Sequence, residues 1–436
     1  MPRILITRTG LITAAGAGVD PVLAAMEAGR SHIPSGVGTG AGAGPAGAAP
    51  AAPAADGTQS PQHRRTPWPT ATLDPADTPW PGGKLWDNAK KYANTAAFGA
   101  VAAAVQAMAG AEPVTGDTAI ASGVVMAVGC SGSDELNEAM ARIAVAAQTD
   151  PRPLPKLLYD EVPDFSYIRG IPSQIGQFVA IATGFRGSNV AVYGEGGAGG
   201  LGALAQASRL LRSGELDRVI VVGVAPPLST TMLVAYDRED RLGTAAVPGA
   251  GPFDAGRSGA FPGQAAVALL LEREDVVPVF GADAVPVELV SCESRCTPER
   301  SGAFAAAAGA ALSRHGAVPD VWWAHGSGST ATDAEECAVL GALAAGAHVT
   351  SSKGTLGTAF ECGGLVDVAL AAESLRRGQT PPVGLLVKPD PDLGDLEFVV
   401  GTARPAASAR TALVTAASHG AKAATAGAAV LWGGAL

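Results

Sequence analysis

The chain has 436 residues, of which 47% are hydrophobic, and its 30 basic and 40 acidic residues give a net charge of −10. This length allows a large buried core, built either as one unit or as two halves. Because the balance is acidic and no Lys/Arg-rich run stands out, nucleic acid and anionic membrane surfaces are poor candidate partners.

The N-terminal sequence and the cysteines indicate a reducing compartment. The N-terminal sequence MPRILITRTG moves straight into a strand without a signal-peptide layout, and no apolar run is long enough to cross a bilayer. The five cysteines are too widely spaced for a disulfide framework. Cys292 and Cys296 lack a second ligand pair at zinc-site spacing. We therefore expect a cytoplasmic protein with reduced thiols and with neither a metal nor a cofactor.

The first part of the chain predicts strands and helices interrupted by one long loop. Residues 3–7 form a strand, and residues 21–29 form a short helix ended by glycine. From residue 35 the sequence is dominated by Gly, Ala, Pro and Thr, which bury too little side chain to offset the ordering entropy. We therefore expect a flexible insertion over residues 35–81. The elements that follow are helices at 90–110, 134–147, 173–183 and 201–211, and strands at 118–128, 189–193, 218–223 and 265–271.

The second part of the chain repeats this alternation. It predicts strands at 287–291, 320–324, 349–351, 398–400 and 412–415 and helices at 302–315, 333–345 and 365–376. Alternating strands and helices indicate an α/β fold whose sheets are covered by helices. We divide the chain into an N-terminal half at residues 1–275 and a C-terminal half at residues 276–436.

A glycine-rich turn between a buried strand and a helix is the first candidate site. Residues 189–204 read NVAVYGEGGAGGLGAL. A side chain on such an elbow projects into a cleft at a helix N-terminus, where backbone N–H groups and the helix dipole favour a thiolate or an oxyanion. Counting from the strand puts the elbow at Gly196, and counting from the helix puts it at Gly197. Glu195 is the one functional side chain nearby, and a purely structural turn is the alternative.

Three further segments follow predicted strands. His325, in WAHGSGS, stands where a strand's carboxyl end meets the active-site edge of an α/β sheet, although a backbone-satisfied histidine is an equal alternative. Lys353, in SKGTLGT, is either a paired buried lysine or a structural one. Asp254 and Arg257, in PFDAGRSG, can pair within a scaffold element.

Taken together, these segments resemble the β-ketoacyl synthases of the thiolase fold. PFD-x-x-R-x-G-x-x-x-G matches a family signature, HGSGS is similar to the family's HGTGT loop, and SKGTLGT is similar to its KS-x-x-GH loop. The resemblance implies two βαβ-rich halves that form a five-layered α-β-α-β-α core. It also implies a Cys-His-His triad. Here the cysteine position is Gly196 or Gly197, His325 is the first histidine, Thr358 replaces the second, and Lys353 is the family's lysine.

Among these sequences, the pattern is most similar to chain length factors, the ketosynthase β subunits of type II polyketide synthases. Those subunits usually carry glutamine in place of the cysteine, whereas this chain carries glycine. The resemblance implies a non-catalytic subunit that forms a heterodimer with a catalytic ketosynthase α subunit. The pair would enclose a tunnel for a chain growing on acyl carrier protein, with walls at Ser133, Leu136, Met140 and Thr231.

Two other functions stay open. The chain could be an enzyme that uses His325 and Glu195 as an acid–base pair for malonyl decarboxylation or hydrolysis. It could also be a stand-alone acyl-binding or scaffold protein.

Overall fold

A computed structural model describes residues 2–35, 68–129, 134–194, 196–225, 228–239, 242–277, 287–419 and 424–434. Twelve strands form one mixed sheet, and its two parts meet where β1 (Ile4–Thr13) pairs with β7 (Val287–Thr297). The short strand β2 (Gly16–Ala17) pairs with β1 alone. On one side of β1 the order is β6 (Ala265–Arg273), β5 (Arg218–Val224), β3 (Ser122–Val128) and β4 (Asn189–Tyr193). Beyond β7 lie β14 (Ala424–Gly433), β13 (Thr411–His419), β8 (Val321–Trp323), β9 (His348–Thr350) and β11 (Glu397–Phe398).

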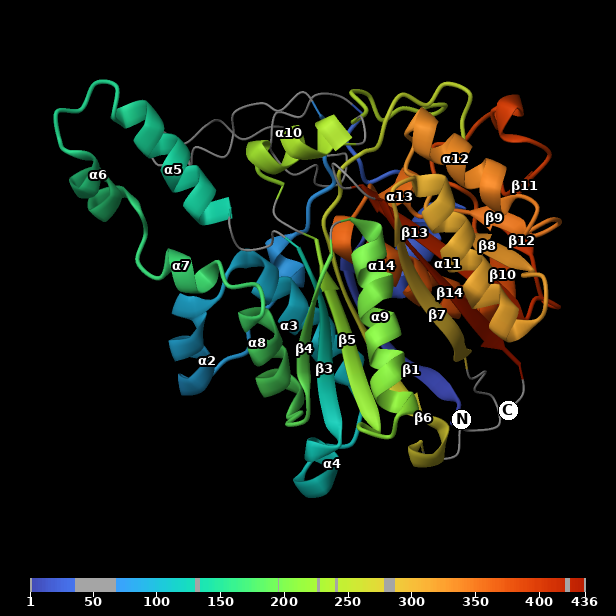
Figure 1. The fold of residues 1–436 in the computed structure, drawn as a ribbon, viewed down its shortest axis with the longest axis horizontal. Helices are drawn as coiled ribbons and strands as arrows, with labels where there is room; N and C mark the ends of the chain where they lie inside the picture. The colour runs from blue at the N-terminus through green and yellow to red at the C-terminus, as the bar shows by residue number, and fades with distance from the viewer. Residues whose placement is uncertain are drawn as a thin grey trace.

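Helices cover both outer faces of this sheet and fill the space between its two parts (Figure 1). α3 (Thr95–Met108) and α8 (Gln174–Thr183) pack on the first part, and α11 (Arg300–His315), backed by α12 (Thr330–Leu340), packs on the second. Between them, α9 (Gly197–Arg212) and α14 (Gly363–Arg377) contact strands of both parts. This arrangement confirms the predicted α/β, thiolase-like architecture with five layers. The division of the chain at residue 275 stays a prediction.

Burial explains why the central elements form where they do. β6 is buried along nearly its whole length, as expected of a strand covered by helices on both faces. α14 buries twelve of its fifteen residues because it lies in the central layer. The remaining helices are α1 (Val19–Glu27), α2 (Lys84–Ala89), α4 (Gly116–Ile120), α10 (Thr230–Glu239) and α13 (Lys353–Leu356).

The sequence predicted most of these elements, with several differences. Residues 118–120, expected in a strand, lie in α4, and α10 was not predicted. β4 was expected to be buried, but it is the last strand of the sheet, and Asn189 and Tyr193 are exposed at its ends. β14 was not predicted, because its alanines and glycines carry little of the β-branched signal typical of strands.

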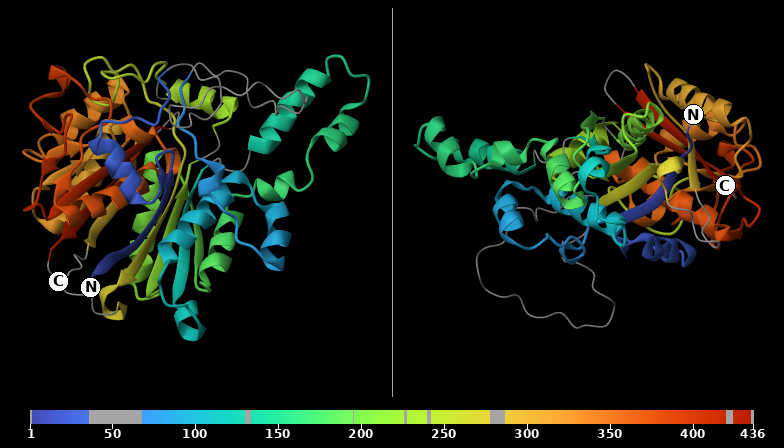
Figure 2. Two further views of the ribbon diagram at one scale, coloured as in Figure 1. Left: turned by 180° about the vertical axis from the view of Figure 1, so that it is seen from behind. Right: turned by 90° about the horizontal axis from the view of Figure 1, so that it is seen from below.

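One segment stands away from the layers as an arm (Figures 1 and 2). It consists of α5 (Asp134–Ala146), α6 (Leu154–Glu161) and α7 (Ser166–Arg169), and α5 packs on α6 and α7. At its base, Arg169 forms an ion pair with Glu135 (3.0 Å) and its carbonyl accepts a hydrogen bond from the Asn94 side chain (2.8 Å). The arm exposes large apolar side chains, including Met140, Val145, Leu154, Tyr159 and Tyr167.

Part of the predicted 35–81 insertion is packed on the body. Residues 36–67 lie outside the described residues. Ala71 exchanges backbone hydrogen bonds with the segment at Pro262 and Gln264 (3.0 and 2.8 Å), and it is fully buried. In the described ranges, no helix has the length and apolar character needed to cross a membrane.

Candidate functional site

The glycine turn joins β4 to α9 and forms one wall of a small cavity. Gly196 is the N-cap of α9, with φ of 61° and ψ of −168°, and Gly197 is the first helical residue. Both line the cavity. The helix therefore begins four residues earlier than the sequence predicted, directly at the elbow.

Space around the two glycines distinguishes the two possible elbow positions. A Cβ on Gly196 would lie 2.7 Å from the Cβ of Ser418, and its left-handed φ disfavours any other residue. A Cβ on Gly197 would meet its nearest neighbours at 3.3–3.5 Å, and one of them is Cε1 of His325. Gly197 is therefore the position from which a side chain would reach the histidine, and here that side chain is absent.

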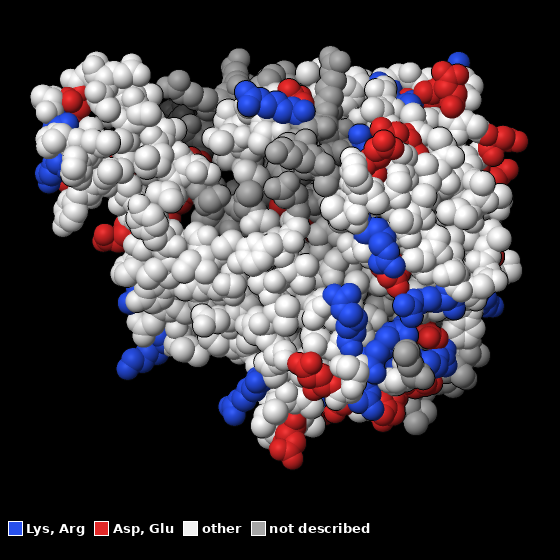
Figure 3. All heavy atoms as spheres, viewed as in Figure 1, with Lys and Arg blue, Asp and Glu red and all other residues white. Residues whose placement is uncertain are grey.

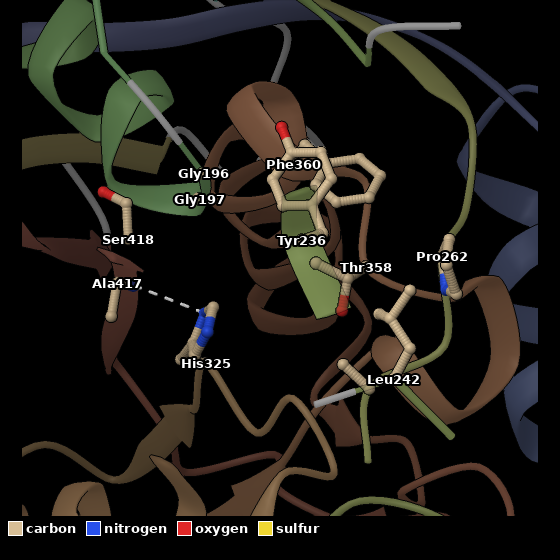
Figure 4. Close-up of a pocket in the computed structure, with 11 residues that line it drawn as sticks. Gly196, Gly197, Tyr236, Leu242, Pro262, His325, Thr358, Phe360, Ala417 and Ser418 are labelled. Carbon is tan, nitrogen blue, oxygen red and sulfur yellow. Dashed lines mark hydrogen bonds between the residues drawn. The ribbon is translucent and has the colours of Figure 1, made fainter. Parts of the chain in front are cut away.

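His325 follows β8 and faces this position from across the cavity (Figure 4). The imidazole is buried, and its Nδ1 accepts a hydrogen bond from the backbone N–H of Ala417 (3.3 Å). An acceptor at Nδ1 places the proton of the neutral ring on Nε2. The histidine is thus held in one orientation and one tautomer.

Glu336, on α12, fixes the loop that carries His325. Its two carboxylate oxygens accept hydrogen bonds from the backbone N–H groups of His325 (2.8 Å) and Gly326 (2.9 Å). Thr415 donates a third (2.6 Å). Burial raises the pKa of this carboxyl, and these donors oppose the rise. Sequence reasoning missed Glu336 and Asp333, although their three-residue spacing after HGSGS puts both carboxyls on one helix face.

Asp333 ties the same loop to the PFD segment. Its side chain accepts hydrogen bonds from the backbone N–H groups of Phe253 (3.0 Å) and Gly328 (3.2 Å), and Arg257 lies 3.5 Å away. Burial raises the pKa of Asp333 to about 7, although the hydrogen bond from the Phe253 N–H and the charge of Arg257 act to lower this pKa. The expected pairing of Arg257 with the Asp254 side chain is wrong. Asp254 instead accepts hydrogen bonds from three backbone N–H groups, while Arg257 also binds Asp390 (2.6 Å).

Thr358 and Lys353 have different places around the site. Thr358 lines the cavity, and its hydroxyl has no hydrogen-bond partner among the described residues. Lys353 is not a lining residue. It forms a buried ion pair with Asp367, whose other carboxylate oxygen accepts a hydrogen bond from Ser352 (2.6 Å). Burial raises the pKa of Asp367, and Lys353 opposes that rise.

None of the four cysteines that the structure describes lines the cavity. The Cys292 thiol donates to the carbonyl of Leu201 (3.2 Å), and the Cys362 thiol donates to the carbonyl of Ala359 (3.0 Å). Burial raises the pKa of both thiols well above the usual range, which disfavours the thiolate. Neither can serve as a relocated nucleophile.

The predicted tunnel residues lie away from the cavity. Leu136 is half-buried and Met140 is exposed, both on α5 of the arm, and Thr231 is exposed on α10. Ser133 and Glu195 lie outside the described residues. Of the predicted site residues that the structure describes, Gly196, Gly197, His325 and Thr358 line the same cavity. The roles of Leu136, Met140 and Thr231 as tunnel walls stay predictions.

Comparison with known families shows which family the chain belongs to. The model of the beta-ketoacyl synthase N-terminal domain matches residues 88–276, and that of the C-terminal domain matches residues 292–385. Together these matches cover more than half of the chain. The chain belongs to the β-ketoacyl synthase family. The assignment of His325, Lys353, Thr358 and the elbow glycines to the catalytic positions of this family stays a prediction.

The curated relatives of this ketosynthase-family chain come from Streptomyces. It is 33% identical over 249 residues to the actinorhodin polyketide putative beta-ketoacyl synthase 2 of Streptomyces coelicolor, a match that covers 55% of this chain and 60% of the relative. It is 31% identical over 229 residues to the tetracenomycin polyketide synthase ketoacyl synthase beta subunit of Streptomyces glaucescens, with 50% and 55% covered. The match thus spans less than two thirds of either relative.

Solved structures share the fold over the full chain. The structure of the ishigamide ketosynthase/chain length factor superposes with a TM-score of 0.77 at 20% identity and covers 100% of both chains. A type II acyl-carrier protein complex with its ketosynthase gives a TM-score of 0.74 at 18% identity, covering 99% of this chain and 100% of that one. These similarities establish the thiolase-like ketosynthase fold.

Proposed function

We propose that this chain is a chain length factor: a non-catalytic subunit that pairs with a catalytic ketosynthase and shapes the tunnel for polyketide elongation on acyl carrier protein. It works in the cytoplasm, where its thiols stay reduced. The observation that carries the proposal is the elbow at Gly197, where a Cβ would lie 3.5 Å from the His325 ring. Acyl transfer by a ketosynthase begins with attack by a nucleophile at this position, and glycine has none.

The names of the relatives support a partner subunit. One is called a ketoacyl synthase beta subunit and another a beta-ketoacyl synthase 2. Both names designate a second ketosynthase-type protein beside a first one. A chain of this family that lacks the nucleophile and keeps the fold can contribute to elongation when another chain supplies the catalytic cysteine.

The surface of the chain supports a broad apolar interface. Among the described strands, β4 pairs with β3 alone, so one side of its backbone is open to another chain. The arm exposes large apolar side chains and lies on the same side of the molecule as β4 (Figure 1). It also carries charged side chains of both signs (Figure 3), some of them in ion pairs such as Lys156–Asp160 (2.8 Å). Exposed apolar patches of this kind mark protein interfaces. We place the ketosynthase partner here.

Co-expression with a cysteine-bearing ketosynthase from the same gene neighbourhood tests the pairing. We expect the two chains to co-purify at one to one and to stay together during gel filtration. Purification of this chain as a stable homodimer in the presence of the ketosynthase would contradict the proposal and favour a stand-alone acyl-binding protein.

A second candidate function is residual acid–base chemistry, which the single orientation and tautomer of His325 favour. It would give decarboxylation or hydrolysis of a malonyl group by this chain alone. Turnover of malonyl-carrier protein by the purified chain, lost in His325→Ala, would support this second function.

A further inference from the structure

The cavity at the elbow is far smaller than a site for an acyl chain. Its volume is about 40 Å³, enough for about three water molecules, since each needs roughly 10–15 Å³. Sites that enclose small-molecule ligands usually measure about 300–1,000 Å³. The side chains that close this cavity therefore decide what can reach Gly197.

Two aromatic side chains from distant parts of the sequence close it. The rings of Tyr236 and Phe360 stack with their centroids 3.9 Å apart and their planes at 31°. Both line the cavity, and Figure 4 shows them across it from His325. The two tilted rings are in direct contact, and aromatic contacts stabilise a structure beyond the area that they bury.

The backbone of Phe360 supports a specific role for this ring. Its φ is 41°, in the left-handed region that bulky residues avoid, although Phe360 is almost fully buried. Such an outlier persists only where the surroundings hold it in place, and outliers of this kind cluster at functional sites. Here the left-handed φ belongs to the residue whose ring stacks on Tyr236 over the cavity.

Tyr236 reaches the cavity from α10, a helix at the molecular surface. α10 is anchored by Leu233, which is fully buried in a small cluster with Leu242 and Ala260. Thr231, Val234 and Ala235 are exposed on the same helix. The helix therefore presents one ring to the cavity while most of its length faces outward.

Resting on the proposed function, we propose that Tyr236 and Phe360 form an aromatic plug that excludes acyl chains from the degenerate site of this subunit. The growing chain is then accommodated only by the site that carries a cysteine and by the tunnel between subunits. The pair acts as a specificity determinant, because it removes a second, unproductive pocket for the same acyl group.

The plug can be tested on the isolated chain by placing a thiol behind it. Gly197→Cys puts this thiol beside His325, and its Cβ requires the Ala416 side chain, 3.3 Å away, to shift by a few tenths of an ångström. The variant is treated with iodoacetamide or with its N-dodecyl analogue, and alkylation of the peptide that contains position 197 is followed by mass spectrometry. In each case the thiolate sulfur displaces iodide and the thiol proton passes to buffer. Peptide mapping separates this reaction from that of the exposed Cys296.

We expect the small reagent to alkylate the introduced thiol and the dodecyl reagent to react with it slowly. Adding Phe360→Gly or Tyr236→Ala should raise the rate with the dodecyl reagent by about tenfold or more, as expected when a stacked, buried ring no longer blocks the path. Tyr236→Phe keeps the ring and is the matched control, with no change expected. Phe360→Gly suits the left-handed φ, so at least one opening variant should fold normally.

Three results would overturn the plug. The first is equally fast alkylation by both reagents with the rings intact. The second is an unchanged dodecyl rate in both opening variants, verified as folded by thermal melting. The third is an introduced thiol that neither reagent reaches even after the plug is opened. None of these results depends on a ketosynthase partner, so failure here is distinct from failure to form a heterodimer.

Discussion

A Cβ atom on Gly197 would lie 3.5 Å from Cε1 of His325, so a side chain at this position would contact the histidine. The surrounding frame is intact, because Glu336 fixes the histidine loop and Asp333 anchors it to the PFD segment. The hydrogen bonds that position the histidine loop are therefore formed, although the elbow residue is glycine.

The first prediction concerns the two elbow glycines. Gly197→Cys should lose less stability than Gly196→Cys, because its Cβ requires only a small shift of the Ala416 side chain, which would lie 3.3 Å away. Gly196→Cys should lose about 1–2 kcal/mol from its left-handed φ alone, and more from the approach to Ser418. Urea unfolding of both variants measures this difference. Equal stability of the two would show that the elbow has been placed one residue away from its true position.

A second prediction concerns the buried pair of Lys353 and Asp367. Lys353→Met leaves the Asp367 carboxylate buried without its counter-ion, and should cost about 3–5 kcal/mol of unfolding free energy. The double variant Lys353→Met/Asp367→Leu should recover most of that loss, because it removes the unpaired charge. Denaturant unfolding of the wild type, both single variants and the double variant completes the cycle. A double variant no more stable than Lys353→Met would mean that the pair is not the source of the effect.

A third prediction is a pH dependence that arises from Asp333. Burial raises its pKa to about 7, above the value of about 3.9 for an unfolded aspartate. Between these values the native state binds more protons than the unfolded state. The contribution of Asp333 is therefore fully present below about pH 4 and is lost as pH rises through 7, with a slope of up to about 1.4 kcal/mol per pH unit.

Asp333→Asn isolates this contribution because it cannot titrate. The difference in unfolding free energy, wild type minus variant, should fall as pH rises from 4 to 7 and level off above 7. Chemical denaturation at several pH values measures it. A difference that is constant, or that grows with pH, would show that Asp333 is ionised in the folded protein throughout this range.

A fourth prediction tests the arm as the partner interface. Tyr159 and Tyr167 are 83% and 70% exposed on the arm. Tyr159→Asp and Tyr167→Asp place charges in the proposed apolar interface and should weaken co-purification with the ketosynthase at least about tenfold, the equivalent of 1.4 kcal/mol. Val318→Asp, at a 61% exposed residue between α11 and β8, is the matched control. If all three variants bind the ketosynthase alike, the arm is not the interface.

A fifth prediction concerns product length. If Leu136 and Met140 face the shared tunnel of the heterodimer, Leu136→Trp and Met140→Trp should shorten the polyketide made by the reconstituted pair. Val145→Trp, at an exposed position on the same helix, serves as the control. Mass spectrometry of the products gives the chain lengths. Unchanged lengths in the Leu136 and Met140 variants would remove both residues from the tunnel wall.

The sequence predicted the architecture because the alternation of apolar strands and helices survives the high alanine and glycine content. It could not choose between Gly196 and Gly197, since the choice depends on φ and on the approach of Ser418 from β13. The sequence indicated Lys353 as a candidate buried lysine but did not indicate its partner, because Asp367 lies on a later helix of the chain. The Tyr236–Phe360 contact joins residues more than a hundred positions apart, which no local pattern reveals.

The arm and the edge strand β4 show another limit of the sequence. Residues 134–147 have the pattern of an amphipathic helix and do form α5. Ile143 is buried, but Met140 and Val145 stay exposed on the arm. Likewise, the apolar residues of β4 read as a buried strand, although it lies at the sheet edge. In both places the apolar pattern of the sequence fits burial against the proposed partner chain, and the single chain leaves several of these side chains partly or fully exposed.

The most direct test of the central claim is elongation of malonyl-carrier protein by the reconstituted pair. We expect products only when both chains are present. Replacement of the ketosynthase's catalytic cysteine should abolish them, and His325→Ala in this chain should leave the rate within about twofold, well below the effect of 10²–10⁴ expected for loss of a general acid or base. Turnover by this chain alone would contradict a non-catalytic role. So would loss of elongation by the pair when this chain carries His325→Ala and the ketosynthase is intact.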